Sequence, residues 1–512
     1  MLFNGQKKMF LYHLDPLFFQ DSTSDGYGDF QGFLNKINYL EDLGVDAIIF
    51  PDLFNQEKTI LKPPDVSVFN KYGKLVELRQ IIEHFKTKQI DFLMEISLKD
   101  ILNSNMNANL EDKTTQEVLI KKVNLQNQQI DWSNDESTKF LNHIITFWTR
   151  RNVHNFIIND FEDLATGKTE WHSALISHLE HIYKAIKKID PQITICLKSH
   201  RLNPHTINLI FKDQIGKICD YFIDNAYGWL CTHKHHPQAI LEPFVAKKLF
   251  YRLKKIRLDP QLNHHYIIAF DSNQIGRISS RWFDETALHN RAHKTFLLLA
   301  NFLPYSTITY YGNELGMLRT PIKDPNQYYN FDYNEKKRML GSLGYPEEVF
   351  HKSQRYLSAI HSQSIFSWDN TKFSGFSQAQ NLFRHSSLNS QFLNVATESA
   401  DSHSVLNFYK DLINFIKTNK LVRMFFLNPT VIKIKKVPAQ NLFVYQLNQN
   451  KEQVQLLINP SNTTYGKRLA KKYHQLLSSY SWKPFRTYQK LKFIKPYESF
   501  VYINKIKLKD PV

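Results

Sequence analysis

The chain has 512 residues, of which 42% are hydrophobic and 14% aromatic, enough to bury a large core, and this excludes a disordered protein. No apolar run is long enough for a secretory signal peptide or a membrane span, and three cysteines without C-x-x-C spacing predict no disulfide framework. We therefore expect a cytoplasmic protein without a membrane span. The formal charge of +17 is spread along the chain without a nucleic-acid motif, so a solvated basic surface is favoured over nucleic-acid binding.

The first predicted strand is followed by an acidic, glycine-containing loop. Residues 10–14 read F-L-Y-H-L, and residues 21–29 read D-S-T-S-D-G-Y-G-D. Oxygen ligands from Asp21, Asp25 and Asp29, with a backbone carbonyl near Tyr27, would suit a hard cation. A plain Asp/Gly turn before a helix explains the same spacing equally well.

Helix-spaced and strand-like segments then alternate along the chain. Residues 30–43 and 75–85 have apolar side chains at helical spacing, and each is followed by a short apolar strand, at residues 44–51 and 90–96. Strands that alternate with helices predict a parallel sheet, and a chain of this length suits an α/β barrel.

The segment from Trp148 to Asp163, W-T-R-R-N-V-H-N-F-I-I-N-D-F-E-D, shows the repeating unit most clearly. An apolar helix ends at Trp148, a buried strand covers residues 156–158, and polar residues follow. Chemistry in α/β barrels sits at such carboxyl ends of strands. The acidic residues from Asp160 onward also fit a solvated turn that caps a helix.

The same pattern continues toward the C-terminus. A helix is predicted over residues 171–189, a strand over 193–197 that ends at Lys198, and another strand over 266–270. Residues 271–284 read D-S-N-Q-I-G-R-I-S-S-R-W-F-D. From Val431 onward, alternating stretches predict a set of antiparallel strands.

Several of these segments resemble the α-amylase superfamily (glycoside hydrolase family 13), in its oligo-1,6-glucosidase branch. They are G-V-D-A-I-I-F-P at 44–51, P-Y-S-T-I-T-Y-Y-G-N-E-L-G-M at 304–317, and F-S-W-D through G-F at 366–376. The resemblance implies a TIM (β/α)8 barrel over residues 1–430. It implies reduced inserted loops, about 52–75 and 101–135, including a shortened loop domain after strand 3, and a small antiparallel β-sandwich domain over 431–512.

The acidic loop resembles the calcium loop D-x-N-x-D-G-x-G-D of that branch. The resemblance implies a structural Ca²⁺ held by Asp21, Asp25, Asp29 and the carbonyl of Tyr27, with Thr23 in place of the family's Asn. We expect no organic cofactor.

The resemblance places the family's three catalytic carboxylates at Asn159 (nucleophile), Lys198 (proton donor) and Asn273 (transition-state stabiliser). An amide is a poor nucleophile and cannot neutralise a developing cation, so no family catalytic group is intact. The same resemblance assigns substrate contacts to Tyr12, Asp65, Asp100, Ile157, Ser272 and Arg277.

Three functions remain open from the sequence. The first is a pseudoenzyme that binds an α-glucoside, a phosphorylated sugar or a protein partner such as an active paralogue. The second is an active retaining α-glucosidase that uses relocated carboxylates, with Asp160 and Asp271 as candidates. The third is a binding protein that works through its basic surface.

Overall fold

The structure is a computed structural model. It describes residues 8–53, 72–98, 123–124, 129–130, 135–164, 171–211, 213–256, 264–283, 285–323, 328, 331–427, 431–437, 442–449, 452–466, 473–480, 486–488 and 493–505. The predicted substrate residues Asp65 and Asp100 lie outside the described residues, as does most of the two predicted loop regions.

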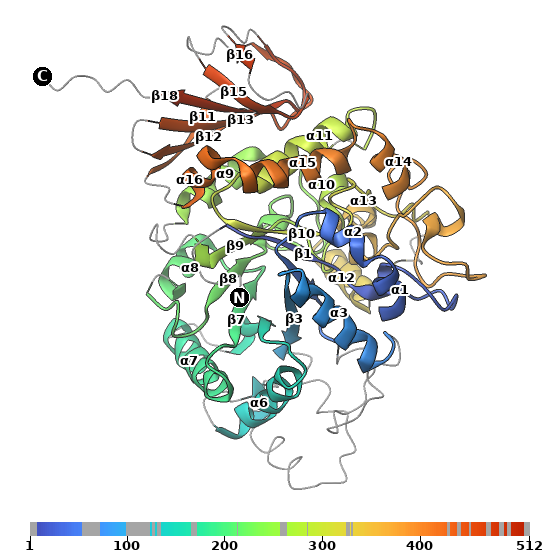
Figure 1. The fold of residues 1–512 in the computed structure, drawn as a ribbon, viewed down its shortest axis with the longest axis vertical. Helices are drawn as coiled ribbons and strands as arrows, with labels where there is room; N and C mark the ends of the chain where they lie inside the picture. Colours follow the sequence, from blue (N-terminus) through green and yellow to red (C-terminus); the bar gives the residue numbers. More distant parts are fainter. Residues whose placement is uncertain are drawn as a thin grey trace, which may run out of the picture.

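Eight parallel strands close into a barrel in the order β1-β10-β9-β8-β7-β6-β3-β2 (Figure 1). They are β1 (Phe10–His13), β2 (Ala47–Phe50), β3 (Asp91–Ser97), β6 (Asn155–Asn159), β7 (Thr194–Ser199), β8 (Tyr221–Asp224), β9 (Tyr266–Ala269) and β10 (Ser306–Tyr310). This confirms the α/β class and the TIM barrel. The sequence reading missed one of these strands, β8.

Helices surround the barrel strands (Figure 1). They are α1 (Phe30–Asn35), α2 (Ile37–Asp42), α3 (Leu75–Thr87), α6 (Asp135–Thr149), α7 (Trp171–Ile189), α8 (Pro204–Phe211), α9 (Ala246–Lys255), α10 (Ile278–Trp282), α11 (His289–Asn301), α12 (Phe331–Ser342), α13 (Glu347–Leu357), α14 (Val395–Ala400), α15 (Val405–Thr418) and α16 (Lys420–Leu427). A two-stranded ladder, β4 (Val123–Asn124) with β5 (Gln129–Ile130), lies between β3 and α6 in the chain. Among the described residues, no helix combines the length and apolar character that a bilayer crossing requires.

Alternation along each strand divides the core into two layers. Leu11, Leu93, Ile157, Cys196 and Ala269 belong to one buried cluster, which fills the inside of the barrel. Their strand neighbours, such as Tyr12 and Ile158, belong to a larger cluster that packs against the helices. A residue two positions along a strand therefore returns to the same layer.

The C-terminal strands form a six-stranded antiparallel sheet in the order β11-β12-β13-β18-β15-β16 and a two-stranded sheet, β14-β17. They are β11 (Val431–Val437), β12 (Leu442–Gln449), β13 (Glu452–Ile458), β14 (Tyr465–Gly466), β15 (Tyr473–Ser478), β16 (Arg486–Tyr488), β17 (Phe493–Ile494) and β18 (Ser499–Lys505). Val454 and Val501 join the large barrel core, while Leu457 and Phe500 pack with Ile494 of β17. The small antiparallel C-terminal domain is confirmed, and its boundary at residues 430/431 stays a prediction.

A buried ion pair joins β8 to α9. The Asp224 carboxylate accepts hydrogen bonds from Nε (2.9 Å) and Nη2 (2.6 Å) of Arg252, and also from the hydroxyl of Tyr266. The side chains of Asp224 and Arg252 are 1% and 8% exposed, so removing either one would leave a buried charge without its counter-charge.

We predict that Arg252→Met lowers the free energy of unfolding by about 3–5 kcal/mol, measured by urea denaturation. The control is Arg79→Met, which removes an ion pair to Glu83 whose side chains are 70% and 48% exposed. That variant should lose about 0.5 kcal/mol or less. Equal losses in the two variants would contradict a structural role for the Asp224–Arg252 pair.

Candidate functional site

Polar side chains end the interior layer at the carboxyl ends of five barrel strands. Each comes two residues after a member of the interior cluster, and they are His13, Glu95, Asn159, Lys198 and Asp271. Because side chains alternate along each strand, these groups face the mouth of the barrel, above the buried apolar cluster that fills its inside. This is the place where α/β barrels carry their chemistry.

Glu95 and Lys198 form a buried ion pair at this mouth. Lys198 Nζ lies 2.6 Å from Glu95 Oε1, and the two residues are 7% and 4% exposed, respectively. Nε2 of His13 lies 3.7 Å from the same oxygen, and the Asn159 amide hydrogen-bonds the same carboxylate. We call His13, Glu95, Asn159 and Lys198 the mouth cluster.

The charges in the mouth cluster set each other's protonation. Burial by itself would raise the pKa of Glu95, but the charge of Lys198 and the hydrogen bonds from Lys198 and Asn159 hold that pKa below its usual value. Burial also lowers the pKa of His13 to about 4, so this imidazole is neutral at pH 7. At neutral pH the cluster therefore holds one carboxylate that is already paired with an ammonium group.

The structure brings together two of the three family positions, Asn159 and Lys198, through Glu95. The third, Asn273, is half-buried, and its backbone carbonyl accepts a hydrogen bond from the Gln363 amide at 3.3 Å. The sequence reading did not include His13 or Glu95 among the site residues. A glutamate within the apolar strand D-F-L-M-E-I-S was the available signal, because a buried carboxylate requires a partner.

Asp271, one of the two candidates for a relocated catalytic carboxylate, makes contacts that stabilise the fold. It is 2% exposed, its carboxylate lies 3.4 Å from Nη2 of Arg281, and it accepts a hydrogen bond from the backbone N–H of Ile278 at 3.0 Å. Burial raises the pKa of this carboxyl group. Asp271 therefore holds the start of α10 in place.

Asp160 lies beside the mouth in a left-handed backbone conformation, with φ of 60°. Its Oδ2 accepts a hydrogen bond from the Ser97 hydroxyl at 2.9 Å. Nearby, buried Glu162 accepts a hydrogen bond from the Ser199 hydroxyl at 2.5 Å, and burial raises its pKa. The charge of Asp160 raises the pKa of Glu162 further, so the two carboxyl groups are electrostatically coupled.

The predicted substrate contacts that the structure describes are buried within the fold. Four of the positions, Tyr12, Ile157, Ser272 and Arg277, are completely buried, each with 0% exposure. Tyr12 lies in the outer layer and donates to Glu314 at 2.7 Å, and Arg277 donates to the carbonyl of Tyr311 at 2.6 Å. The structure gives these side chains partners within the fold, and their assignment as substrate residues stays a prediction.

The acidic loop is held by its own hydrogen bonds. Asp21 Oδ1 accepts from the N–H groups of Thr23 (2.9 Å) and Ser24 (2.8 Å), and its Oδ2 accepts from Gly26 N–H (2.9 Å) and the Ser377 hydroxyl (2.5 Å). Asp29 accepts from Gly32 N–H at 2.7 Å and caps α1. Asp25 accepts from Tyr27 N–H at 2.8 Å.

The described residues of this loop do not fit a cation. Each Asp21 oxygen already accepts two hydrogen bonds, which uses its two lone pairs. Within the described ranges, no three acidic, histidine or cysteine side chains gather as metal ligands. These hydrogen bonds favour the capped Asp/Gly turn over the ligand set Asp21, Thr23, Asp25, Tyr27 and Asp29, and a calcium titration distinguishes the two.

We predict that 5 mM Ca²⁺, compared with EDTA, shifts the Tm of the protein by less than about 1 °C, because the carboxylates are already satisfied. The matched variant is Asp25→Asn, which removes one exposed carboxylate. A rise of several degrees that disappears in this variant would show that the loop rearranges to bind calcium.

We predict that Lys198→Met lowers the free energy of unfolding by about 3 kcal/mol or more, because Glu95 is left buried without its counter-charge. The control Lys184→Met removes an exposed pair to Glu180 and should change little. In the double variant Lys198→Met/Glu95→Leu we expect a coupling of about 2 kcal/mol. Strictly additive losses in urea denaturation would contradict the ion pair.

Comparison with known proteins agrees with the fold and its motifs. The alpha-amylase catalytic-domain family matches residues 14–103 and 99–424. A trehalose-6-phosphate hydrolase of Bacillus subtilis is 19% identical over 97% of both chains, and a glucan 1,6-alpha-glucosidase of Streptococcus pneumoniae is 19% identical over 81% of this chain and 84% of its own. The isomaltulose synthase of Protaminobacter rubrum superposes with a TM-score of 0.81 at 16% identity, covering 98% of this chain and 99% of the synthase. The chain belongs to the alpha-amylase family, with an α-glucosidase-like barrel.

Proposed function

We propose that this alpha-amylase family protein binds an α-glucoside without hydrolysing it. The observation that carries the proposal is the buried Lys198–Glu95 pair, 2.6 Å long, with Asn159 on the same carboxylate. This arrangement occupies the positions at which the family resemblance places the nucleophile and the proton donor.

Retaining hydrolysis needs two carboxyl groups about 5 Å apart, one as the nucleophile and one as the proton donor. Asn159 offers an amide, which cannot form the glycosyl ester. Glu95 carries a pKa below its usual value, so it holds no proton to give at neutral pH. The ammonium of Lys198 would also repel the positive charge that develops on the sugar ring.

The support for an α-glucoside as the ligand is the family and the polar groups that stay accessible. Relatives at 19% identity are named as a glucan 1,6-alpha-glucosidase and a trehalose-6-phosphate hydrolase. Asn159, Asp160 and Asn273 are half-buried near the mouth and keep hydrogen-bonding groups for sugar hydroxyls. A cytoplasmic location belongs to this proposal as well.

A second candidate is residual hydrolysis by relocated carboxyl groups. Burial raises the pKa of Glu162, although the Arg201 guanidinium at 3.8 Å opposes the shift, and a raised pKa is the property expected of a proton donor. Ser199 holds this side chain and Ser97 holds that of Asp160, so both have fixed positions. Asp271 supports this candidate less well because Arg281 and a backbone N–H already bind it.

The test is hydrolysis of p-nitrophenyl α-glucoside and isomaltose by the full-length protein, with binding of isomaltose measured by calorimetry. We predict turnover no higher than in an Asp160→Asn/Glu162→Gln double variant, because the Lys198–Glu95 pair leaves no nucleophile at the mouth. Turnover that is lost in the double variant would favour the second candidate. Absence of both turnover and isomaltose binding would contradict the proposed ligand.

A further inference from the structure

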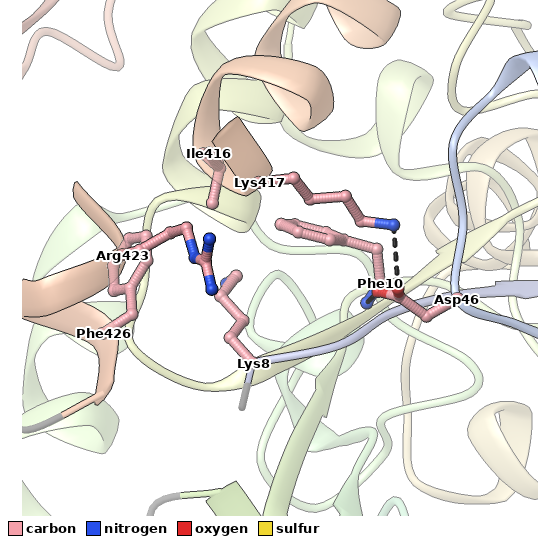
Figure 2. Close-up of a pocket in the computed structure, with 7 residues that line it drawn as sticks. All are labelled: Lys8, Phe10, Asp46, Ile416, Lys417, Arg423 and Phe426. Carbon is pink, nitrogen blue, oxygen red and sulfur yellow. Dashed lines mark hydrogen bonds and ion pairs between the residues drawn. The ribbon is translucent and has the colours of Figure 1, made fainter. Parts of the chain in front are cut away.

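A cavity of about 330 Å³ lies at the amino-terminal end of the barrel strands, away from the mouth (Figure 2). Phe10, the first residue of β1, and Asp46, which precedes β2, form its floor. α15 and α16 contribute the other wall. We call this cavity the basal pocket. It is independent of the proposed function, since it shares no residue with the mouth cluster.

Lys8 gives the basal pocket a buried ammonium group without a carboxylate partner among the described residues. Lys8 is 9% exposed, and its Nζ donates to the carbonyls of Leu303 (2.7 Å) and Tyr305 (2.6 Å). An ammonium group has three N–H donors, so one is left for a ligand in the cavity. Nζ also lies 5.2 Å from the ring centroids of Phe10 and Phe426.

The other two cations of the basal pocket differ in their pairing. Lys417 Nζ is 2.8 Å from Asp46 Oδ1 and 2.6 Å from the carbonyl of Gly44, so its charge is already compensated. Arg423 is exposed on α16, lines the same cavity, and has no ion pair among the described residues. Figure 2 shows Lys8, Lys417 and Arg423 gathered around one space, with only the Lys417–Asp46 interaction drawn between charged groups.

From this arrangement we propose that the basal pocket binds the phosphate group of a small phosphate monoester. When Lys8 is protonated, it and Arg423 supply two positive charges without a carboxylate partner among the described residues, which match the charge of about −1.5 to −2 that a phosphate monoester carries at pH 7. The planar guanidinium of Arg423 can bind two phosphate oxygens at once, and Lys8 acts as a point charge behind it.

The apolar wall defines the rest of the ligand. Phe10, Ile416 and Phe426 line the same cavity, and Phe426 is held in place by Phe302, with ring centroids 5.4 Å apart. Aromatic faces beside cations suit an organic body attached to the phosphate better than a bare inorganic ion. Burial lowers the pKa of Lys8 well below its usual value, and a bound dianion would favour its charged form.

A purely structural role for Lys8 is the competing explanation, because the amino-terminal face of such barrels usually serves stability. That role accounts for the bonds of Lys8 to the carbonyls of Leu303 and Tyr305. It does not account for Arg423, which is exposed, lines the same cavity and has no ion pair within the described part of the chain.

The experiment is isothermal titration of the full-length protein with glucose 6-phosphate, with glucose and inorganic phosphate as companion ligands. We expect binding of glucose 6-phosphate, no heat from glucose, and weaker binding of inorganic phosphate. Arg423→Gln should raise the Kd on the order of tenfold or more, because it removes charge-assisted hydrogen bonds.

The matched control is Lys420→Gln, which removes an exposed charge from the same helix without touching the cavity and should change the Kd less than about twofold. Lys8→Met is the second variant, used if circular dichroism shows that it folds, and it should weaken binding as well.

No binding at concentrations up to about 10 mM, or binding unchanged by Arg423→Gln, would overturn the site. Inorganic phosphate binding as tightly as glucose 6-phosphate would overturn the role of the aromatic wall. Isomaltose binding should be unaffected by Arg423→Gln, which separates this result from the proposed function.

Discussion

Two opposite charges, those of Lys198 and Glu95, are buried together at the mouth of the barrel, and each requires the other. Removing either partner leaves a charge in a place of low exposure, which costs several kcal/mol. The pair also decides what the mouth can do chemically. The ammonium of Lys198 holds the carboxylate in its charged form, and the family resemblance places the proton donor at the position of Lys198. The stability of the barrel mouth and the proposed loss of hydrolytic chemistry therefore both depend on this one interaction.

The repeating unit of the fold was predictable because its signals are local. Apolar residues at helical spacing followed by short apolar strands gave the barrel, and alternation gave the C-terminal strands. The strand β8 was missed because its segment, Tyr221–Asp224, has only two aliphatic or phenyl side chains between polar flanks. What makes it a strand is pairing with β7 and β9, which lie far away in the sequence.

The candidate site was predicted less well, for a physical reason. The positions Asn159 and Lys198 could be found from the strands that end there, but their common partner Glu95 lies on another strand. A buried glutamate signals that some partner exists, whereas the identity of that partner depends on how the barrel closes. The burial of Tyr12 and Arg277 could not be predicted from the sequence either, because both are polar. Their hydrogen-bond acceptors, Glu314 and the carbonyl of Tyr311, lie beside them only in the folded chain.

The proposal that the barrel mouth has no hydrolytic activity is tested most directly by asking whether a sugar can become covalently attached there. The protein would be incubated with 5-fluoro-α-glucosyl fluoride, which traps the glycosyl-enzyme intermediate of retaining glucosidases, and its intact mass would be measured beside an active oligo-1,6-glucosidase. We predict no increase in mass for this protein and a glycosyl adduct on the active enzyme. An adduct on this protein, mapped to Asp160, Glu162 or Glu95, would show that a carboxylate at the mouth is free to react and would contradict the account.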